Sequence, residues 1–223
     1  RLSQPRPLRQ PYRLLQRQGY TNIKVADRAN LDLINQSAVE TFFRSEQPEY
    51  VIHAAGRIGG IKANIRYPAE FLYENMMITG NVIWSAHKHH VKKLMYISCG
   101  CSYPTKSKQP IKEEYLLTGV PEPTNEGLSM AKISGIKLCQ TIAREYNKNF
   151  ISCIPANTYG INDHYDEMRS HVISALMQRF HEAKQDNLPE VTMWGTGAAK
   201  REFIYVDDLA RAVLFLMDNY NRP

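Results

Sequence analysis

The sequence predicts an α/β fold: a Rossmann-like parallel sheet with helices on both faces. Segments with strand character alternate with segments of helical periodicity along nearly the whole chain, as they do in βαβ units. The strand-like runs at residues 50–56 and 93–100 are short and mostly apolar, which is typical of parallel strands that are covered on both faces. Each run ends in small residues, so a loop is expected after it.

The first part of the chain is expected to be irregular. Residues 1–12 contain three prolines and show no hydrophobic period, which predicts an irregular basic arm ahead of a Rossmann-like domain over residues 13–223. Residues 13–19 favour one or two helical turns that end at Gly19. Apolar runs and helical spacing then predict, in order, a strand at 22–28, a helix at 35–46, the strand at 50–56 and a long helix at 68–90.

The second part continues the alternation. After the strand at 93–100, an amphipathic pattern predicts a helix at 126–146, followed by a strand and loop at 150–160. The remaining patterns predict a helix at 171–184, a strand at 190–195 and a helix at 207–219. Ligands of such sheets bind beyond the carboxyl ends of the strands. We therefore expect the site at loops 54–60, 98–104 and 155–160 and in the segment after Gly195.

Composition excludes several classes of protein. A hydrophobic share of 43% and a charged share of 22% are ordinary for a soluble globular domain. No apolar run has the length of a membrane span and no signal peptide is visible, so a cytoplasmic location is expected. Five arginines in residues 1–18 supply most of the net charge of +6, and the rest is nearly balanced, which argues against a nucleic-acid surface. The four cysteines form neither a disulfide framework nor a zinc motif, so no metal site is predicted.

Several long strings resemble one enzyme family. They are "IHAAGRIGGIKANIRYPAEFLYENMMITGNVIWSAH", "CSYP", "EPTNEGLSMAKISGIKLC", "PANTYG", "SHVISALMQRFHEAK" and "WGTGAAKREFIYVDDLA". Together they resemble the GDP-L-fucose synthase family, within the extended short-chain dehydrogenases/reductases that act on nucleotide sugars. The resemblance implies epimerisation of a GDP-4-keto-6-deoxy-mannose at two carbons, followed by reduction of its keto group with NADPH. It also implies a homodimer that pairs the helices at 68–90 and 126–146.

The resemblance assigns roles to individual residues. Cys101 and His171 match the epimerisation acid and base, and Lys132 matches the lysine that binds the nicotinamide ribose. The implied GDP-sugar contacts are Arg179, Trp194 and Arg201, and the implied cofactor contacts are Ala54, Ala55, Ile97, Ser98, Pro155, Ala156, Asn157, Thr158 and His171. Taken singly, each has an ordinary structural alternative: a core cysteine or tryptophan, a helix-capping histidine, or solvated lysines and arginines.

The choice of cofactor depends on the segment after the strand expected at 22–28. Arg28 could meet the 2′-phosphate of NADP, whereas Asp27 could accept hydrogen bonds from the ribose hydroxyls of NAD. The residues leave both open, and the resemblance favours NADP.

The sequence departs from the family pattern at three places. The tyrosine expected one turn before Lys132 is Leu128, which cannot donate a proton, and the serine expected four residues before Tyr103 is Cys99, a weaker donor. Residues 1–15 contain no glycine, whereas a dinucleotide fold begins with a glycine-rich turn. We expect a missing first strand, a truncated C-terminal substrate lobe and impaired reduction. The alternative is a non-catalytic homologue that acts as a partner subunit or binding protein.

Overall fold

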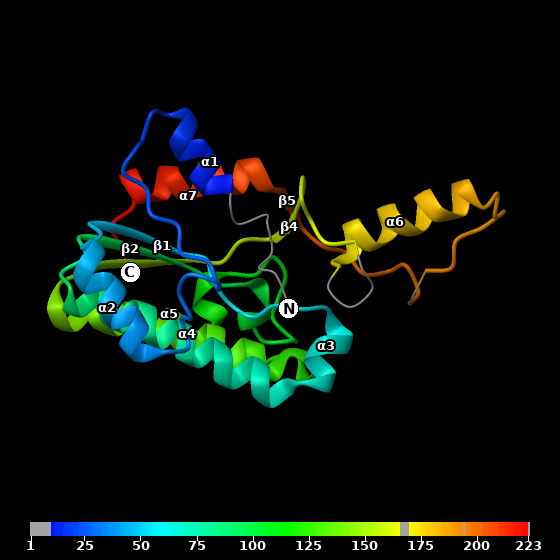
Figure 1. Cartoon of the computed structure of the whole chain (residues 1–223). Helices are drawn as coiled ribbons and strands as arrows, with labels where there is room; N and C mark the ends of the chain where they lie inside the picture. The colour runs from blue at the N-terminus through cyan, green and yellow to red at the C-terminus, as the bar shows by residue number, and fades with distance from the viewer. Residues whose placement is uncertain (1–9, 166–169, 194, 223) are drawn as a thin grey trace.

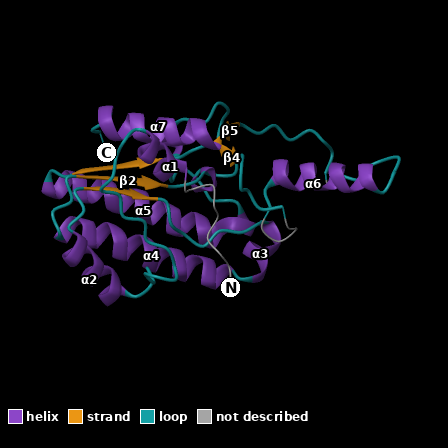
Figure 2. Ribbon diagram, turned by 45° about the horizontal axis from the view of Figure 1, so that its top comes forward, coloured by secondary structure: helices purple, strands orange, loops and turns teal. Residues whose placement is uncertain are grey.

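The computed structural model describes residues 10–165, 170–193 and 195–222, and its fold is the predicted α/β class. Three parallel strands form the central sheet in the order β1-β2-β3. They are β1 (Tyr50–His53), β2 (Lys93–Ile97) and β3 (Asn149–Cys153). Tyr50 of β1 is paired with Lys93 of β2, which is paired with Asn149 of β3, so all three strands run side by side toward one edge (Figure 2).

Helices cover both faces of this sheet (Figure 1). On one face lie α2 (Gln36–Glu46), α4 (Pro68–Lys88) and α5 (Glu126–Tyr146), and on the other lies α7 (Val206–Asn219), with α1 (Gln10–Arg17) packed on it. The middle strand explains why two cores form. Leu94 and Tyr96 point into the core under α2, α4 and α5, whereas Met95 and Ile97 point into the core under α7. All five residues of β2 are buried, which accounts for its apolar run.

Close approach fixes α5 against the sheet. A Cβ atom on Gly135 of α5 would lie 2.5 Å from the ring of Tyr96 and 2.6 Å from the methyl group of Thr79 on α4. Only glycine lets the three elements meet at this point. At the start of α4, a Cβ on Gly127 of α5 would lie 2.5 Å from the carbonyl oxygen of Pro68. The two long helices therefore hold their register on each other and on β2, which places the residues of α5 at the sheet edge.

A smaller lobe follows the central sheet. It contains β4 (Asn157–Tyr159) and β5 (Phe203–Tyr205), which pair in parallel, and α6 (Val172–Gln185), which extends away from the sheet (Figure 1). Short helices complete the described chain: α3 (Ile61–Arg66) and the 3-10 turns η2 (Gly100–Ser102), η3 (Glu113–Tyr115) and η4 (Pro123–Asn125). Over the described residues, no helix is both long and apolar enough to cross a bilayer.

Most predicted elements are confirmed, but two strands are wrong. Residues 21–27 run outside any strand, and Val25 is 49% exposed. In the described sheet β1 pairs only with β2, so this segment takes no part in the ladder. Residues 190–193 also form no strand, and Met193 is 52% exposed. Apolar patterning alone does not make a strand where neither a partner nor a core is present.

The N-terminal boundary also differs from the prediction. Helix α1 begins at Gln10, so the last residues assigned to the irregular arm form its first turn, where proline is well tolerated. Gln10 and Pro11 are buried, and α1 packs on α7. Residues 1–9 of the predicted arm lie outside the described residues.

Candidate active site

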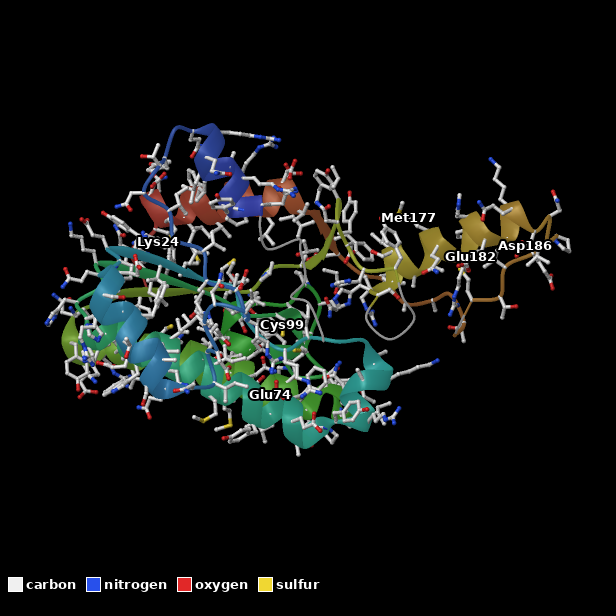
Figure 3. The ribbon with its side chains drawn as sticks, in the orientation of Figure 1. Lys24, Glu74, Cys99, Met177, Glu182 and Asp186 are labelled. Carbon is white, nitrogen blue, oxygen red and sulfur yellow. The ribbon has the colours of Figure 1, made fainter. Side chains whose placement is uncertain are left out.

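The candidate site is at the carboxyl edge of the central sheet, where the predicted loops leave the strands. The loops at 54–60, 98–104 and 154–156 leave β1, β2 and β3 at this edge. The backbone N–H of Ser98 donates to the carbonyl oxygen of Cys153 at 2.8 Å, so β2 and β3 stay together until their loops begin. Figure 3 shows Cys99 at this edge, near the centre of the molecule and well away from the labelled residues of α6.

Lys132 brings a buried positive charge to this edge. It lies on the buried face of α5 and is only 6% exposed. Its Nζ donates to the carbonyl oxygen of Ile97 at 3.0 Å and lies 5.1 Å from the centroid of the Tyr96 ring. Burial lowers the pKa of this lysine, because the low dielectric disfavours the charged form. Leu128, one helical turn earlier, is 8% exposed and shares this buried face, as predicted from residues four apart.

The loop after β1 is held close to Lys132. Asn75 of α4 donates from Nδ2 to the carbonyl oxygen of Arg57 at 3.0 Å, and its Oδ1 accepts from the Arg57 backbone N–H at 2.9 Å. A Cβ on Gly56 would lie 2.8 Å from Asn75 Oδ1 and 3.7 Å from Lys132 Nζ. Glycine therefore permits a backbone approach that a side chain would block. The predicted contact residues Ala54 and Ala55, in this loop, are half-buried.

The guanidinium of Arg57 anchors the same loop from its other side. Its Nη1 forms ion pairs with Glu70 at 2.6 Å and with Glu74 at 2.5 Å, both on α4. The guanidinium also lies 5.1 Å from the centroid of the Phe71 ring. Its charge is compensated by these two carboxylates, so we assign Arg57 to holding the loop in place.

His53 is a residue of this site that sequence reasoning missed. It ends β1, is 3% exposed and packs against Tyr96 with ring centroids 5.4 Å apart. Burial, with a smaller contribution from the charge of Lys132, lowers its pKa to about 3. The imidazole is therefore neutral at ordinary pH, and its Nε2 has no hydrogen-bond partner among the described residues. The sequence feature that could have identified His53 is a histidine at the end of an otherwise apolar strand.

Cys99 and Cys101 lie in a tight turn directly after β2. The backbone N–H of Ser102 donates to the carbonyl oxygen of Cys99 at 3.1 Å, and the hydroxyls of Ser98 and Ser102 are 3.0 Å apart. A side-chain interaction with Cys101, together with the nearby charge of Lys132, lowers the pKa of the Cys99 thiol. The same interaction and burial raise the pKa of Cys101, so its thiol stays protonated.

The other predicted site residues lie in or near the smaller lobe. Pro155, Ala156 and Thr158 are half-buried, and Asn157 is exposed and donates from Nδ2 to the carbonyl oxygen of Glu202 at 3.2 Å. Together they form the connection from β3 into β4. Their backbone can therefore line the same sheet edge, and their role as cofactor contacts stays a prediction.

The structure does not place the predicted base and the predicted GDP-sugar contacts beside Lys132 and Cys101. His171 is exposed at the N-cap of α6, and in the described part of the chain no hydrogen bond joins it to Cys101. Arg179 is half-buried on α6 and donates to the Thr192 carbonyl oxygen at 3.4 Å, and the Arg201 guanidinium donates to the neighbouring Lys200 carbonyl oxygen at 2.8 Å. Arg28 is exposed in the segment after α1. Trp194 lies outside the described residues.

Comparison with known proteins confirms the predicted resemblance. A relative from Arabidopsis thaliana, named putative GDP-L-fucose synthase 2, is 52% identical over 209 residues, which are 94% of this chain and 64% of the relative. The GDP-L-fucose synthase of Escherichia coli is 45% identical over 206 residues, which are 92% of this chain and 64% of the relative. The chain therefore spans just under two thirds of the length of both relatives.

Solved structures share the fold. A GDP-D-glycero-L-gluco-heptose synthase from Campylobacter jejuni, crystallised in the presence of NADPH, matches with a TM-score of 0.89 and 36% identity over 96% of this chain and 72% of that chain. A GDP-L-fucose synthetase from Naegleria fowleri bound to NADP matches with a TM-score of 0.84 and 27% identity over 96% of this chain and 70% of that chain. The family model for NAD dependent epimerases and dehydratases matches residues 7–223. The chain therefore belongs to the NAD-dependent epimerase/dehydratase family.

Proposed function

We propose that this site acts on a GDP-4-keto-6-deoxy-mannose, by NADP-dependent 3,5-epimerisation and 4-keto reduction of the GDP-L-fucose synthase type. The names of the relatives support the substrate class and the reaction. One observation in the structure carries the proposal: a buried lysine ammonium beside a glycine loop at the carboxyl edge of a parallel sheet. A buried charge costs several kcal/mol, so its retention at a ligand-binding edge points to a function.

The residues at this edge fit a nicotinamide ribose. An ammonium group has three N–H donors, and in the described structure Lys132 uses one of them on the Ile97 carbonyl oxygen. The remaining donors suit a pair of ribose hydroxyls. Gly56 leaves room next to Lys132 Nζ where a Cβ would collide with Asn75. When bound, the cofactor would supply the hydride for reduction of the ketone.

Side chains of this protein would donate and abstract the protons of the reaction. The Cys101 thiol, whose pKa is raised, is a proton donor at neutral pH, as the epimerisation acid must be. The base would come from His171, which α6 carries and which must approach the substrate for the reaction. Leu128 occupies the position from which a tyrosine would protonate the reduced oxygen, and its side chain has no proton to donate. We therefore propose that epimerisation is retained better than reduction.

Three further properties belong to the same proposal. NADP rather than NAD is supported by the NADP-bound relative and by an exposed Arg28 that can reach a phosphate. A homodimer through α4 and α5 is supported by exposed apolar side chains on these helices: Tyr73, Met76, Trp84 and Met130. A cytoplasmic location is part of the proposal, and the names of the relatives as synthases support it.

An experiment can separate the two half-reactions. The chain is incubated with GDP-4-keto-6-deoxy-mannose in deuterated water, and NMR follows deuterium entering at the two carbons beside the ketone. We expect incorporation that is lost in Cys101→Ala, while NADPH consumption stays slow. The matched control is Cys153→Ala, which removes a thiol outside the Cys99 turn. If neither deuterium uptake nor NADPH consumption occurs although the nucleotide sugar binds, the chain is a non-catalytic homologue.

A further inference from the structure

Two thiols of the candidate site are held together in one short turn. Cys99 is the last residue before the 3-10 turn η2, and Cys101 lies within that turn. Residues two apart are separated by roughly 7 Å even when fully extended, and a turn brings them nearer. Disulfide bonds need Cα atoms about 4.4–6.8 Å apart. The local backbone therefore already places the two cysteines near bonding range.

The surroundings of this turn also permit reaction. The Cys101 side chain interacts with Cys99 and lowers the pKa of its thiol. Both cysteines are free and half-buried, so small molecules can reach them. A Cβ on Gly100 between them would meet nothing within 4 Å, so the middle of the turn has space to adjust while a bond closes.

The two thiols differ in reactivity from the other cysteines. The pKa of Cys99 is lowered, so at a given pH more of this thiol is thiolate, the nucleophilic form, than in an ordinary cysteine. Burial raises the pKa of Cys139 to about 12, and burial also raises the pKa of Cys153. An electrophile or disulfide would therefore react with the activated sulfur of Cys99, which has the sulfur of Cys101 two residues away.

We propose that Cys99 and Cys101 form a redox-active dithiol, which small-molecule disulfides oxidise to an intramolecular Cys99–Cys101 bond. The Cys99 thiolate attacks one sulfur of the reagent, forms a mixed disulfide and releases one thiolate. Cys101 then loses its proton and attacks the Cys99 sulfur, which releases the second thiolate. The reagent gains two electrons, the protein loses them, and the two protons of the dithiol leave with the two small thiols.

The consequence for activity rests on the proposed function. Cys101 is the proton donor of that proposal, and the disulfide would remove its proton and its thiol together. Oxidation would therefore stop epimerisation, and a reductant would restore it. The covalent chemistry is independent of that reading, because it needs only the geometry of the turn.

The test follows the peptide that carries both sulfurs. Trypsin cuts after Lys93 and Lys106, so residues 94–106 contain Cys99 and Cys101 and neither of the other cysteines. The folded chain is incubated at neutral pH with hydroxyethyl disulfide, quenched in acid, alkylated and digested. We expect this peptide to lose two hydrogen atoms in mass and to escape alkylation. Treatment with dithiothreitol before alkylation should reverse both changes.

Matched variants assign the sulfurs. In Cys101→Ser we expect a mixed disulfide trapped on Cys99. In Cys99→Ser we expect slower modification at Cys101, because burial still raises the pKa of its thiol. Cys153→Ser should behave as the unmodified sequence does. A stable mixed disulfide on the unmodified chain, with no internal bond, would overturn the proposal. So would modification of Cys139 or Cys153 as fast as that of Cys99. Both readouts stand whether or not the chain turns over a nucleotide sugar.

Discussion

Leu128→Tyr tests whether this position limits reduction. Leu128 is buried one turn before Lys132 on the same face of α5, so a tyrosine there would place its hydroxyl on the side of the helix that carries the ammonium. A nearby positive charge lowers the pKa of a phenol and favours proton transfer from it. The variant would thus supply a general acid at a place where the present side chain has no polar atom.

The expected gain is larger than the expected damage. A positioned general acid contributes about 10²–10⁴-fold in rate, which corresponds to about 3–5 kcal/mol of barrier. Leu128 is only 8% exposed, so the larger ring must fit into packed space. Overpacking of this kind typically costs about 1–3 kcal/mol of stability. The fold should therefore survive while the chemical step accelerates, provided that the hydroxyl reaches the ketone oxygen.

Leu128→Phe is the matched control, because it adds the same ring without the hydroxyl. Loss of NADPH absorbance is followed with GDP-4-keto-6-deoxy-mannose at the same millimolar NADPH concentration for both variants, and thermal unfolding is recorded for both. We expect similar unfolding temperatures and a rate for Tyr about 10²-fold or more above that for Phe. Equal rates in two folded variants that bind the cofactor would show that Leu128 is not what limits reduction.

Three other predictions concern binding and stability. Because the glycine-free segment up to Gly19 provides no glycine-rich turn for a pyrophosphate, calorimetry should show no saturable NADPH binding at micromolar concentrations; tight binding would contradict this. The pKa of His53 falls from 6.5 to about 3 on folding, so below about pH 6.5 the unfolded chain binds more protons and stability decreases by about 1.4 kcal/mol per pH unit. In urea titrations, His53→Phe should reduce the stability lost between about pH 7 and about pH 5, and an unchanged loss would argue against it. Asn35→Ala should cost about 1 kcal/mol in the same assay, because its side chain accepts from the Ala38 N–H at the start of α2; no change would mean that the cap is dispensable.

Periodic segments with partners were predictable from the sequence, and unpartnered ones were not. The helices at 36–46, 68–88 and 126–146 follow the predicted ranges closely, because each buries an apolar face against the sheet. The segment at 22–28 has a similar apolar pattern, yet it lacks a neighbouring strand, and hydrogen bonding between strands is a property of the pair. The apolar pattern of a segment shows which side chains it could bury, but whether they are buried depends on the neighbouring elements of the fold.

For the site, the family resemblance predicted the residues and the structure shows their environment. The two cysteines were expected at a strand end and Lys132 on the helix at 126–146, but nothing in their order along the chain indicated that the lysine would be buried against Tyr96 and Ile97. His53 was missed for the same reason: burial gives an ordinary imidazole its lowered pKa, and burial depends on packing across three elements. Reactivity at this edge is set by tertiary contacts.

The two departures at the site alter its chemistry in different ways. Leu128 removes a proton donor and leaves an apolar contact, so its effect is a loss. Cys99 replaces a hydroxyl with a thiol whose pKa is lowered by its interaction with Cys101 and by the charge of Lys132, so it adds a group that ionises more readily than an ordinary thiol. A site that has only decayed would have no reason to pair a second thiol with the first inside one turn. The dithiol therefore distinguishes a chain with altered chemistry from one that has only lost activity. Rapid formation of the Cys99–Cys101 disulfide would indicate chemistry that a serine at position 99 could not perform. Inert thiols would leave Cys99 as a second lost donor beside Leu128.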